Sequence, residues 1–357
     1  MRVTDATTTL LALPGAALAT VLLATCGGET AAGPGDTTYS KDLTWTTQRN
    51  TPRPHELYAV WGRSSVDIFA VGSTIVHFDG SLWSTQVALS STAYLHGVWG
   101  TSATDVFAVG AHGTILHYDG TAWTPQNSGT DSLLNGVWGS SGTDVYAFGS
   151  GGTGLHYNGM RWSPVTTAAT QSLFGVWGSS AADVFVVGQS GTILHFDGST
   201  WSSQPSGTTV DLLGVWGISP TDVFAVGASN TILHYDGSGW TVQQTVAGDL
   251  TAIDGIWGSS ASDVFAVGGS RPFAFSPAII MHYDGTRWST SRLGGRDDEF
   301  YSGVWGQSGS DVIVVGTSIT SYAGFYDAEA FILHYGRIQL DRAHLDPVVP
   351  CVGDLRH

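Results

Sequence analysis

Tryptophan recurs at a nearly fixed spacing, and this recurrence constrains the fold more than any other feature of the chain. Seven tryptophans each follow a Val or Ile and precede a Gly: Trp61, Trp99, Trp138, Trp177, Trp216, Trp257 and Trp305. Their separations run from 38 residues, between Trp61 and Trp99, to 48 residues, between Trp257 and Trp305. A period of this length is typical of repeat architectures, whose units bury their apolar faces against one another. The sequence therefore predicts seven units in one large domain.

A second set of tryptophans shows how the array closes. One member follows the first tryptophan in six of the units: Trp83, Trp123, Trp162, Trp201, Trp240 and Trp288. The last unit has none, but Trp45 stands upstream of the first unit. We therefore predict that a strand near residues 42–48 completes the last unit and covers an edge that would otherwise pair with other chains. The rival placement uses residues 338–340 for that strand.

The fourth unit illustrates the local structure. Apolar or alternating runs at residues 173–177, 184–187 and 192–196 are separated by Gly- and Ser-rich turns, which indicates strands. Asp197-Gly198 predicts a tight hairpin leading to a fourth strand at Trp201. Four antiparallel strands without a helix cannot bury both of their faces alone. The predicted fold class is therefore all-β, a seven-bladed β-propeller of four-stranded antiparallel blades, closed by the N-terminal strand near Trp45.

The charge balance excludes some classes of partner. The chain has 29 acidic and 13 basic residues, a formal net charge of −16. A nucleic-acid partner would require clustered basic residues, so none is expected. Two cysteines, Cys26 and Cys351, provide no disulfide framework. We predict no cofactor.

The N-terminal segment predicts export. An uncharged apolar run at residues 10–25 ends at Cys26 and resembles a bacterial lipoprotein signal, in which Cys26 is the lipidated residue. An ordinary secretory signal and an uncleaved anchor are the alternatives. We predict a signal segment over 1–26, a flexible tether over 27–40, the propeller over 41–340 and a tail over 341–357.

The repeat also resembles known propeller families. The string Gly-Thr-Ile-Leu-His-Tyr-Asp-Gly-x-x-Trp at residues 113–123, with a close copy at 191–201, resembles the bacterial neuraminidase repeat, or Asp-box, and more closely the photosystem assembly factor type. The GVWGSSxxDVFAVG units also resemble uncharacterised bacterial envelope propeller lipoproteins. These resemblances imply the propeller fold. Sialidase activity does not carry over, because the first five blades offer only Arg63 and Arg161 for a reaction that needs three arginines.

Two series of repeated polar residues are predicted to be structural. A histidine stands in the third strand of every unit: His77, His117, His156, His195, His234, His282 and His334. These positions diverge around a ring and cannot share a metal ion, so we expect packing or inter-blade hydrogen bonds. An aspartate precedes every second strand, from Asp67 to Asp311, and is expected to accept backbone N–H groups of the preceding turn. We predict no catalytic residue and no metal site here.

Function is expected where the repeat is interrupted. Insertions between strands two and three lie at residues 269–278 and 318–330, on the same face as the connection at 292–301. Aromatic residues and Arg are enriched in binding hot spots. The predicted partner-binding residues are Arg271, Phe273, Phe275, Arg292, Arg296, Tyr322, Phe325 and Tyr326. The alternative is that these are tolerated surface insertions.

The sequence thus predicts a binding or assembly module of the cell envelope, anchored by lipid in the outer membrane or secreted. Its partner would be an envelope protein or polysaccharide, and the chain would be monomeric. A carbohydrate-active hydrolase using Asp297 and Glu299 as acid and base is the runner-up, and a purely structural surface protein is the third class.

Overall fold

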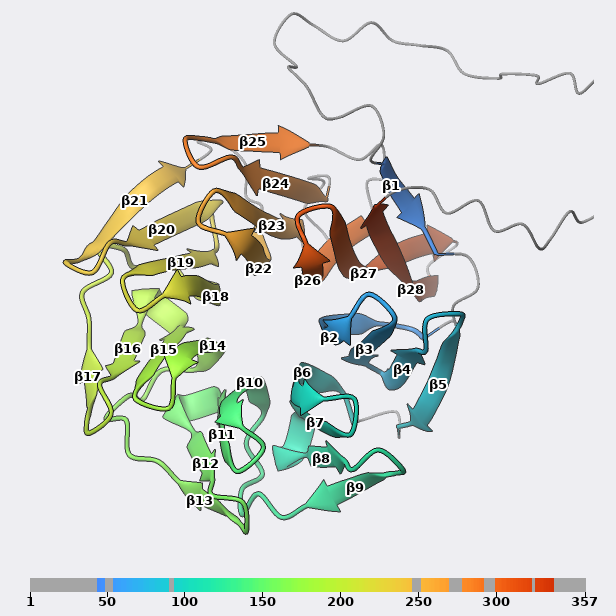
Figure 1. Ribbon diagram of the computed structural model, residues 1–357, viewed down its shortest axis with the longest axis horizontal. Coiled ribbons are helices and arrows are strands. Elements are labelled where there is room, and N and C mark those ends of the chain that lie inside the picture. Colours follow the sequence, from blue (N-terminus) through green and yellow to red (C-terminus); the bar gives the residue numbers. More distant parts are fainter. Residues whose placement is uncertain are drawn as a thin grey trace, which may run out of the picture. The chain divides into compact units, whose positions relative to one another are not determined.

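The computed structural model describes residues 44–48, 54–89, 93–245, 252–269, 278–291, 299–322 and 325–336. The chain divides into two units, Met1–Ser40 and Lys41–His357. The first lies wholly outside the described residues. In the second, seven four-stranded antiparallel sheets are arranged radially as blades of a ring, which confirms the predicted fold class (Figure 1). None of the helices in the described part of the chain is long and apolar enough to span a bilayer.

The two inner strands of each blade carry the conserved core pattern of the repeat. The innermost strands are β2 (Leu57–Ser64), β6 (Leu95–Ser102), β10 (Leu134–Ser141), β14 (Leu173–Ser180), β18 (Leu212–Ser219), β22 (Ala252–Ser260) and β26 (Glu299–Ser308). The second strands are β3 (Asp67–Gly72), β7 (Asp105–Gly110), β11 (Asp144–Gly149), β15 (Asp183–Gly188), β19 (Asp222–Gly227), β23 (Asp263–Gly269) and β27 (Asp311–Tyr322). The apolar residues that follow the first Asp of each second strand, such as Val106, Phe107, Ala108 and Val109 in β7, are almost fully buried, as expected for strands that are covered on both faces.

The two outer strands end each blade, and short 3₁₀ turns join strands two and three in blades two to four. The third strands are β4 (Thr74–Phe78), β8 (Ile115–Tyr118), β12 (Gly154–Tyr157), β16 (Ile193–Phe196), β20 (Thr231–Tyr235), β24 (Ile279–Tyr283) and β28 (Phe325–Gly336). The outermost are β5 (Trp83–Ala88), β9 (Trp123–Gln126), β13 (Trp162–Pro164), β17 (Trp201–Ser203), β21 (Trp240–Thr245), β25 (Trp288–Ser291) and β1 (Thr44–Thr47). The turns are η1 (Ala111–Gly113), η2 (Ser150–Gly152) and η3 (Gln189–Gly191).

Strand β1 completes the last blade, as predicted. Its residues pair antiparallel with β28, with Trp45 opposite Tyr335, and the two rings lie 5.0 Å apart. Trp45 packs against the apolar cluster that blades six and seven share. The rival residues, 338–340, lie outside the described part of the chain, and β1 occupies the edge of β28.

A tryptophan–glycine contact between neighbouring blades forms the inner seam of the ring. Each inner Trp lies against the Gly that follows the equivalent Trp in the next blade, and Trp305 closes the cycle on Gly62. A Cβ built on Gly139 would lie 2.7 Å from Cη2 of Trp99 and 2.6 Å from the carbonyl oxygen of Asp144. Only glycine leaves room for the indole. Each Val-Trp-Gly step therefore contributes its Trp to the contact with the next blade and its Gly to the contact with the preceding blade.

Candidate functional site

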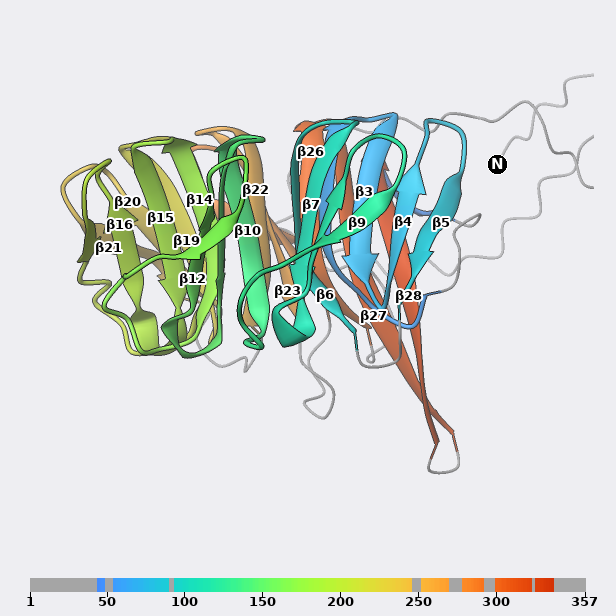
Figure 2. The same cartoon turned by 90° about the horizontal axis from the view of Figure 1, so that it is seen from below.

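The strands of each blade send their turns to two faces of the ring. Turns between strands two and three, together with the blade-to-blade connections, lie on one side, which we call the connection face (Figure 2). Turns between strands one and two, and between strands three and four, lie on the opposite face. The opposite face repeats the same contacts in all seven blades, whereas the connection face carries the departures from the repeat.

The opposite face carries seven nearly identical aspartate–histidine pairs. In every blade, Nε2 of the third-strand histidine lies 2.6 to 2.7 Å from Oδ1 of the second-strand aspartate. In blade three, Ser140 also donates to the second carboxylate oxygen of Asp144 at 2.5 Å. The partners described for this aspartate series are side chains, which corrects the prediction of backbone N–H capping. Of the two roles predicted for the histidines, the structure shows packing, and their hydrogen bonds to the aspartates lie within one blade rather than between blades.

In blades one to six, an aromatic ring of the second strand also packs against the histidine of the pair. In blade two, the His117 ring stacks on Phe107 with centroids 4.4 Å apart, and the equivalent stack recurs in other blades. The His282 hydrogen bond lowers the pKa of the Asp263 carboxyl, and Ser259 adds to the effect against the opposing effect of burial. Seven copies with the same partners indicate a folding role. Among the described residues, no group of three or more His, Cys, Asp or Glu could hold a metal ion.

The Asp-Gly turns between strands three and four use a different aspartate series. Oδ1 of Asp119 accepts the Thr121 hydroxyl at 2.6 Å and the backbone N–H groups of Thr121 and Ala122 at 2.8 and 2.9 Å. Asn158 accepts the equivalent two backbone N–H groups in blade three, so this departure from the series keeps its turn. These carboxylates are therefore committed to turn geometry.

This turn gives a prediction for pH dependence. The hydroxyl of Thr121, then the two backbone donors, lower the pKa of Asp119 from 3.8 to about 2. Because the folded-state pKa is depressed, the stabilisation is present above the unfolded pKa and is lost as the pH falls toward about 2. We expect an NMR titration of the Asp119 carboxyl carbon to show a midpoint near 2. Thr121→Ala should raise that midpoint, and the exposed Thr124→Ala should not. Equal midpoints in both variants would contradict the assignment.

The connection face carries the largest departure from the repeat, a long β-hairpin in blade seven. Strands β27 and β28 each span 12 residues, whereas the other second strands span six or seven. Pairing continues from Ser318 opposite Glu329 to Tyr322 opposite Phe325. The insertion predicted as a loop is therefore a regular two-stranded ribbon, and it projects beyond the ring on this face (Figure 2).

The base of the hairpin is anchored in the ring. The Ala330 backbone N–H donates to the Pro54 carbonyl at 3.0 Å, and the Phe331 ring meets Tyr301 edge-on at 5.6 Å. Tyr301 is 1 % exposed and occupies the place of the Leu that opens most inner strands. Burial, and secondarily the charge of Glu299, raises the pKa of Tyr301. The ribbon thus extends from a fixed base.

The structure places three of the eight predicted partner-binding residues at one location. Tyr322 is opposite Phe325, and Tyr326 is opposite Ser321, at the far end of the hairpin. The remaining predicted residues lie outside the described part of the chain: Arg271, Phe273, Phe275, Arg292 and Arg296. Cys26, the predicted lipidation site, also lies outside it, as does Asp297. Glu299 belongs to the inner strand β26, where it pairs with Ser318, so the predicted connection is shorter than expected.

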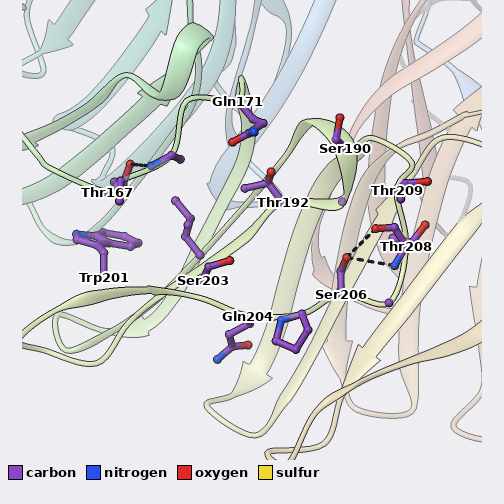
Figure 3. Close-up of a pocket in the computed structure, with 16 residues that line it drawn as sticks. Thr167, Gln171, Ser190, Thr192, Trp201, Ser203, Gln204, Ser206, Thr208 and Thr209 are labelled. Carbon is purple, nitrogen blue, oxygen red and sulfur yellow. Dashed lines mark hydrogen bonds between the residues drawn. The ribbon is translucent and has the colours of Figure 1, made fainter.

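A cavity of about 790 Å³ opens on the connection face beside blade four (Figure 3). Its walls come from the connection that enters the blade, the η3 turn, and the segment that leaves β17. Ser206 fixes that last segment: its hydroxyl donates to the Thr208 carbonyl at 3.2 Å and accepts the Thr208 N–H at 3.3 Å. Hydroxyl and amide side chains with the partly exposed Trp201 dominate the lining, and none of the lining residues is ionisable. Sequence reasoning missed this cavity, because its walls come from three separate segments.

Comparisons with known proteins bear on the fold. No protein-family model and no curated protein sequence matches the chain. The WD40 β-propeller domain of Doa1 superposes with a TM-score of 0.65 and 12 % identity, over 82 % of this chain and 96 % of that one. YCF48 bound to D1 peptide gives a TM-score of 0.62 and 11 % identity, over 84 % and 98 %.

A third structure, YCF48 from Cyanidioschyzon merolae, gives a TM-score of 0.61 and 14 % identity, over 82 % of this chain and 98 % of that one. The resemblances to the neuraminidase repeat and to envelope lipoproteins gain no support from these comparisons and stay predictions. At such low identities, what this chain shares with Doa1 and YCF48 is the β-propeller fold.

Proposed function

We propose that this protein is a binding or assembly module that holds a protein partner on its connection face. The observation that carries the proposal is the β27–β28 hairpin, which extends blade seven on the connection face well beyond the strands described in the other blades. Its backbone is fully paired up to Tyr322 and Phe325, so the hairpin holds its end residues on a fixed scaffold. Binding residues on rigid elements lose less conformational entropy on association.

The comparison with YCF48 supports a protein partner. That propeller, similar in fold to this chain, is described bound to D1 peptide. Nothing finer about the partner comes from it. The acidic net charge of −16 favours a partner with basic residues, because complementary charge steers association.

The proposed location is the cell envelope. The apolar run before Cys26 supports export with lipid attachment at that cysteine, most simply to the outer membrane, and a secreted form is the alternative. We further propose a monomer, because β1 covers the strand edge through which blade seven would otherwise pair with another chain.

A neutral glycan is the second candidate ligand, and the cavity beside blade four favours it. Sugars are bound by hydroxyl and amide groups beside an aromatic ring, and Ser203, Gln171 and Trp201 provide these groups. Such a site would serve binding to envelope polysaccharide. The hydrolase that Asp297 and Glu299 would support ranks below it, because Glu299 is paired with Ser318 in the blade sheet and Asp297 lies outside the described part of the chain.

The proposal is tested by capture from an envelope extract on the immobilised full chain. We expect Tyr322→Ser/Phe325→Ser/Tyr326→Ser to reduce recovery of a specific protein by about tenfold or more, as expected when hot-spot residues are lost. Protein and polysaccharide fractions are scored separately. If the Trp201→Ala variant loses polysaccharide capture and the hairpin variant keeps it, the glycan hypothesis is favoured over the proposed protein partner.

The matched control also replaces three apolar residues with serine, but on the opposite face of the ring. Val66→Ser/Leu82→Ser/Met160→Ser removes three exposed apolar residues, 56 %, 51 % and 84 % exposed, from turns on the opposite face. This variant should capture as well as the original chain. Equal capture by all three proteins would contradict a role for the hairpin end.

A further inference from the structure

One position of the innermost strand differs in every blade, although its neighbours hardly vary. The positions that follow it are Gly (Ala59 in blade one), Val or Ile, Trp and Gly in all seven blades. The residue that precedes them is of a different type each time. We call these seven residues the axial ring: Tyr58, His96, Asn135, Phe174, Leu213, Asp254 and Ser302.

A β-bulge releases this position from the blade core. In blade two, Leu95 pairs with Gly110 and Gly97 pairs with Val109, so the pairing register with the second strand shifts at His96. The same register shift occurs in every other inner strand. A bulge commonly re-aims a side chain. All seven axial-ring residues are partly exposed, whereas the residue before each one is no more than 1 % exposed.

Three of the axial-ring side chains make a described contact with a neighbouring blade. The Tyr58 and His96 rings, from blades one and two, stack with centroids 4.8 Å apart and an interplanar angle of 5°. Asn135 donates through Nδ2 to the Leu173 carbonyl of the next blade at 2.8 Å. The inner strands start on the connection face and border the axis, so the axial ring lies at that end of it (Figure 1).

The variation itself indicates recognition. Packing constrains the core positions of the seven blades in the same way, and most of these positions hold the same or a similar residue, such as Val or Ile before each inner Trp. Seven different types at a single position show that packing makes no common demand there. Phe174 and Leu213, from neighbouring blades, are also large apolar residues at partly exposed positions. Exposed apolar residues indicate a binding surface only when several lie together. Seven dissimilar side chains make the ring asymmetric, as is needed to read an asymmetric ligand.

The axial ring has chemically distinct sectors. Blades one and two contribute the stacked Tyr58 and His96, and blades four and five contribute Phe174 and Leu213. Asp254 of blade six is the acidic member. Aromatic faces and a carboxylate both attract a cation, and the apolar pair favours an aromatic or long aliphatic side chain.

We propose that the axial ring binds a short extended segment of a protein partner that carries a cationic side chain beside an aromatic or long aliphatic one. This inference rests on the proposed function, since it places the partner's segment on the connection face. The cation pairs with Asp254 and the apolar side chain contacts Phe174 and Leu213. The ring thereby selects the partner, while the hairpin adds a second contact.

The repeat supplies variants that the fold should accept. Asp254→Ser places there the residue of blade seven, and Phe174→Asn places there the residue of blade three. The probe is an array of Gly/Ser decapeptides that each contain one pair: Lys-Phe, Glu-Phe, Lys-Ser or Ser-Phe. We expect the full chain to bind Lys-Phe peptides at least about tenfold more tightly than the other three, a difference of about 1.4 kcal/mol. Asp254→Ser should erase preference for Lys, and Phe174→Asn should erase preference for Phe.

The outcomes separate this inference from the proposed function. The hairpin-end variant should keep the array preferences, and so should Val66→Ser/Leu82→Ser. The inference is overturned if the array shows no preference, or if both axial-ring variants keep the preferences of the original chain. Either result overturns it even if capture from the extract still depends on the hairpin. Array preferences that follow the axial-ring variants support it, even if the hairpin variant captures normally and the proposed role of the hairpin fails.

Discussion

Gly139→Ala is expected to lower the free energy of unfolding by about 3 kcal/mol, at the upper end for overpacking. The added Cβ would lie 2.6 Å from the Asp144 carbonyl and 2.7 Å from the Trp99 indole. Neither can move easily. The carbonyl belongs to a paired strand, and the Trp99 ring lies 6.5 Å from both Phe107 and Trp138. The strain therefore falls on the seam between blades two and three.

Urea melts followed by tryptophan fluorescence measure this effect. The matched control is Gly239→Ala, because a Cβ there meets nothing within 4 Å and the backbone angle φ is not in the positive range. That substitution should leave stability nearly unchanged or slightly raised, since alanine reduces the freedom of the unfolded chain. If the two variants melted alike, the tryptophan–glycine seam would not be a source of stability.

Trp45→Ala is expected to lower the free energy of unfolding by about 3 kcal/mol, the lower end of the range for replacing a large aromatic residue. The lower end applies because Trp45 is only partly buried. Its loss removes the ring that packs against Tyr335 and the cluster between blades six and seven. Without this ring, β1, a strand of only four residues, is attached less firmly to the edge of β28.

Thr47→Ala is the control for Trp45→Ala, because Thr47 lies in the same strand and is exposed. Both variants are compared in urea melts of the full chain. A loss below about 1 kcal/mol for Trp45→Ala would contradict the closure of blade seven by β1, since burial of even part of an indole exceeds that value. We expect the Thr47 variant to stay within about 0.5 kcal/mol of the original, as is usual for surface substitutions.

The fold could be predicted because it depends on patterns that the sequence shows directly. The spacing of the tryptophans reveals the blade, and the displaced Trp45 reveals the closure. The seam could not be predicted in the same way. The repeat shows that Gly139 follows Trp138, but only coordinates show that it faces Trp99 of the preceding blade. Likewise, His117 and Asp105 are 12 residues apart and were interpreted separately, although each is the other's partner.

The candidate site could be predicted only in part, for a physical reason. Insertions mark where the repeat is broken, and they led to Tyr322, Phe325 and Tyr326 on the hairpin. The axial ring interrupts nothing, because a single bulged residue such as His96 leaves the repeat length unchanged. Its signal is the variety of residue types at one aligned position, and that variety has meaning only once the bulge shows that these residues leave the core.

The pairing of β1 with β28 also sets the order in which the molecule can be completed. Thr46 and His334, which share a hydrogen bond, are 288 residues apart, so β1 leaves the ribosome long before the strand with which it pairs. The first six blades pair only with their own strands and can form one after another during synthesis. Blade seven remains incomplete until β1 pairs with β28. At high concentration, a β1 from a second nascent chain can pair with the uncovered edge of β28 instead, which is the route to a domain-swapped dimer.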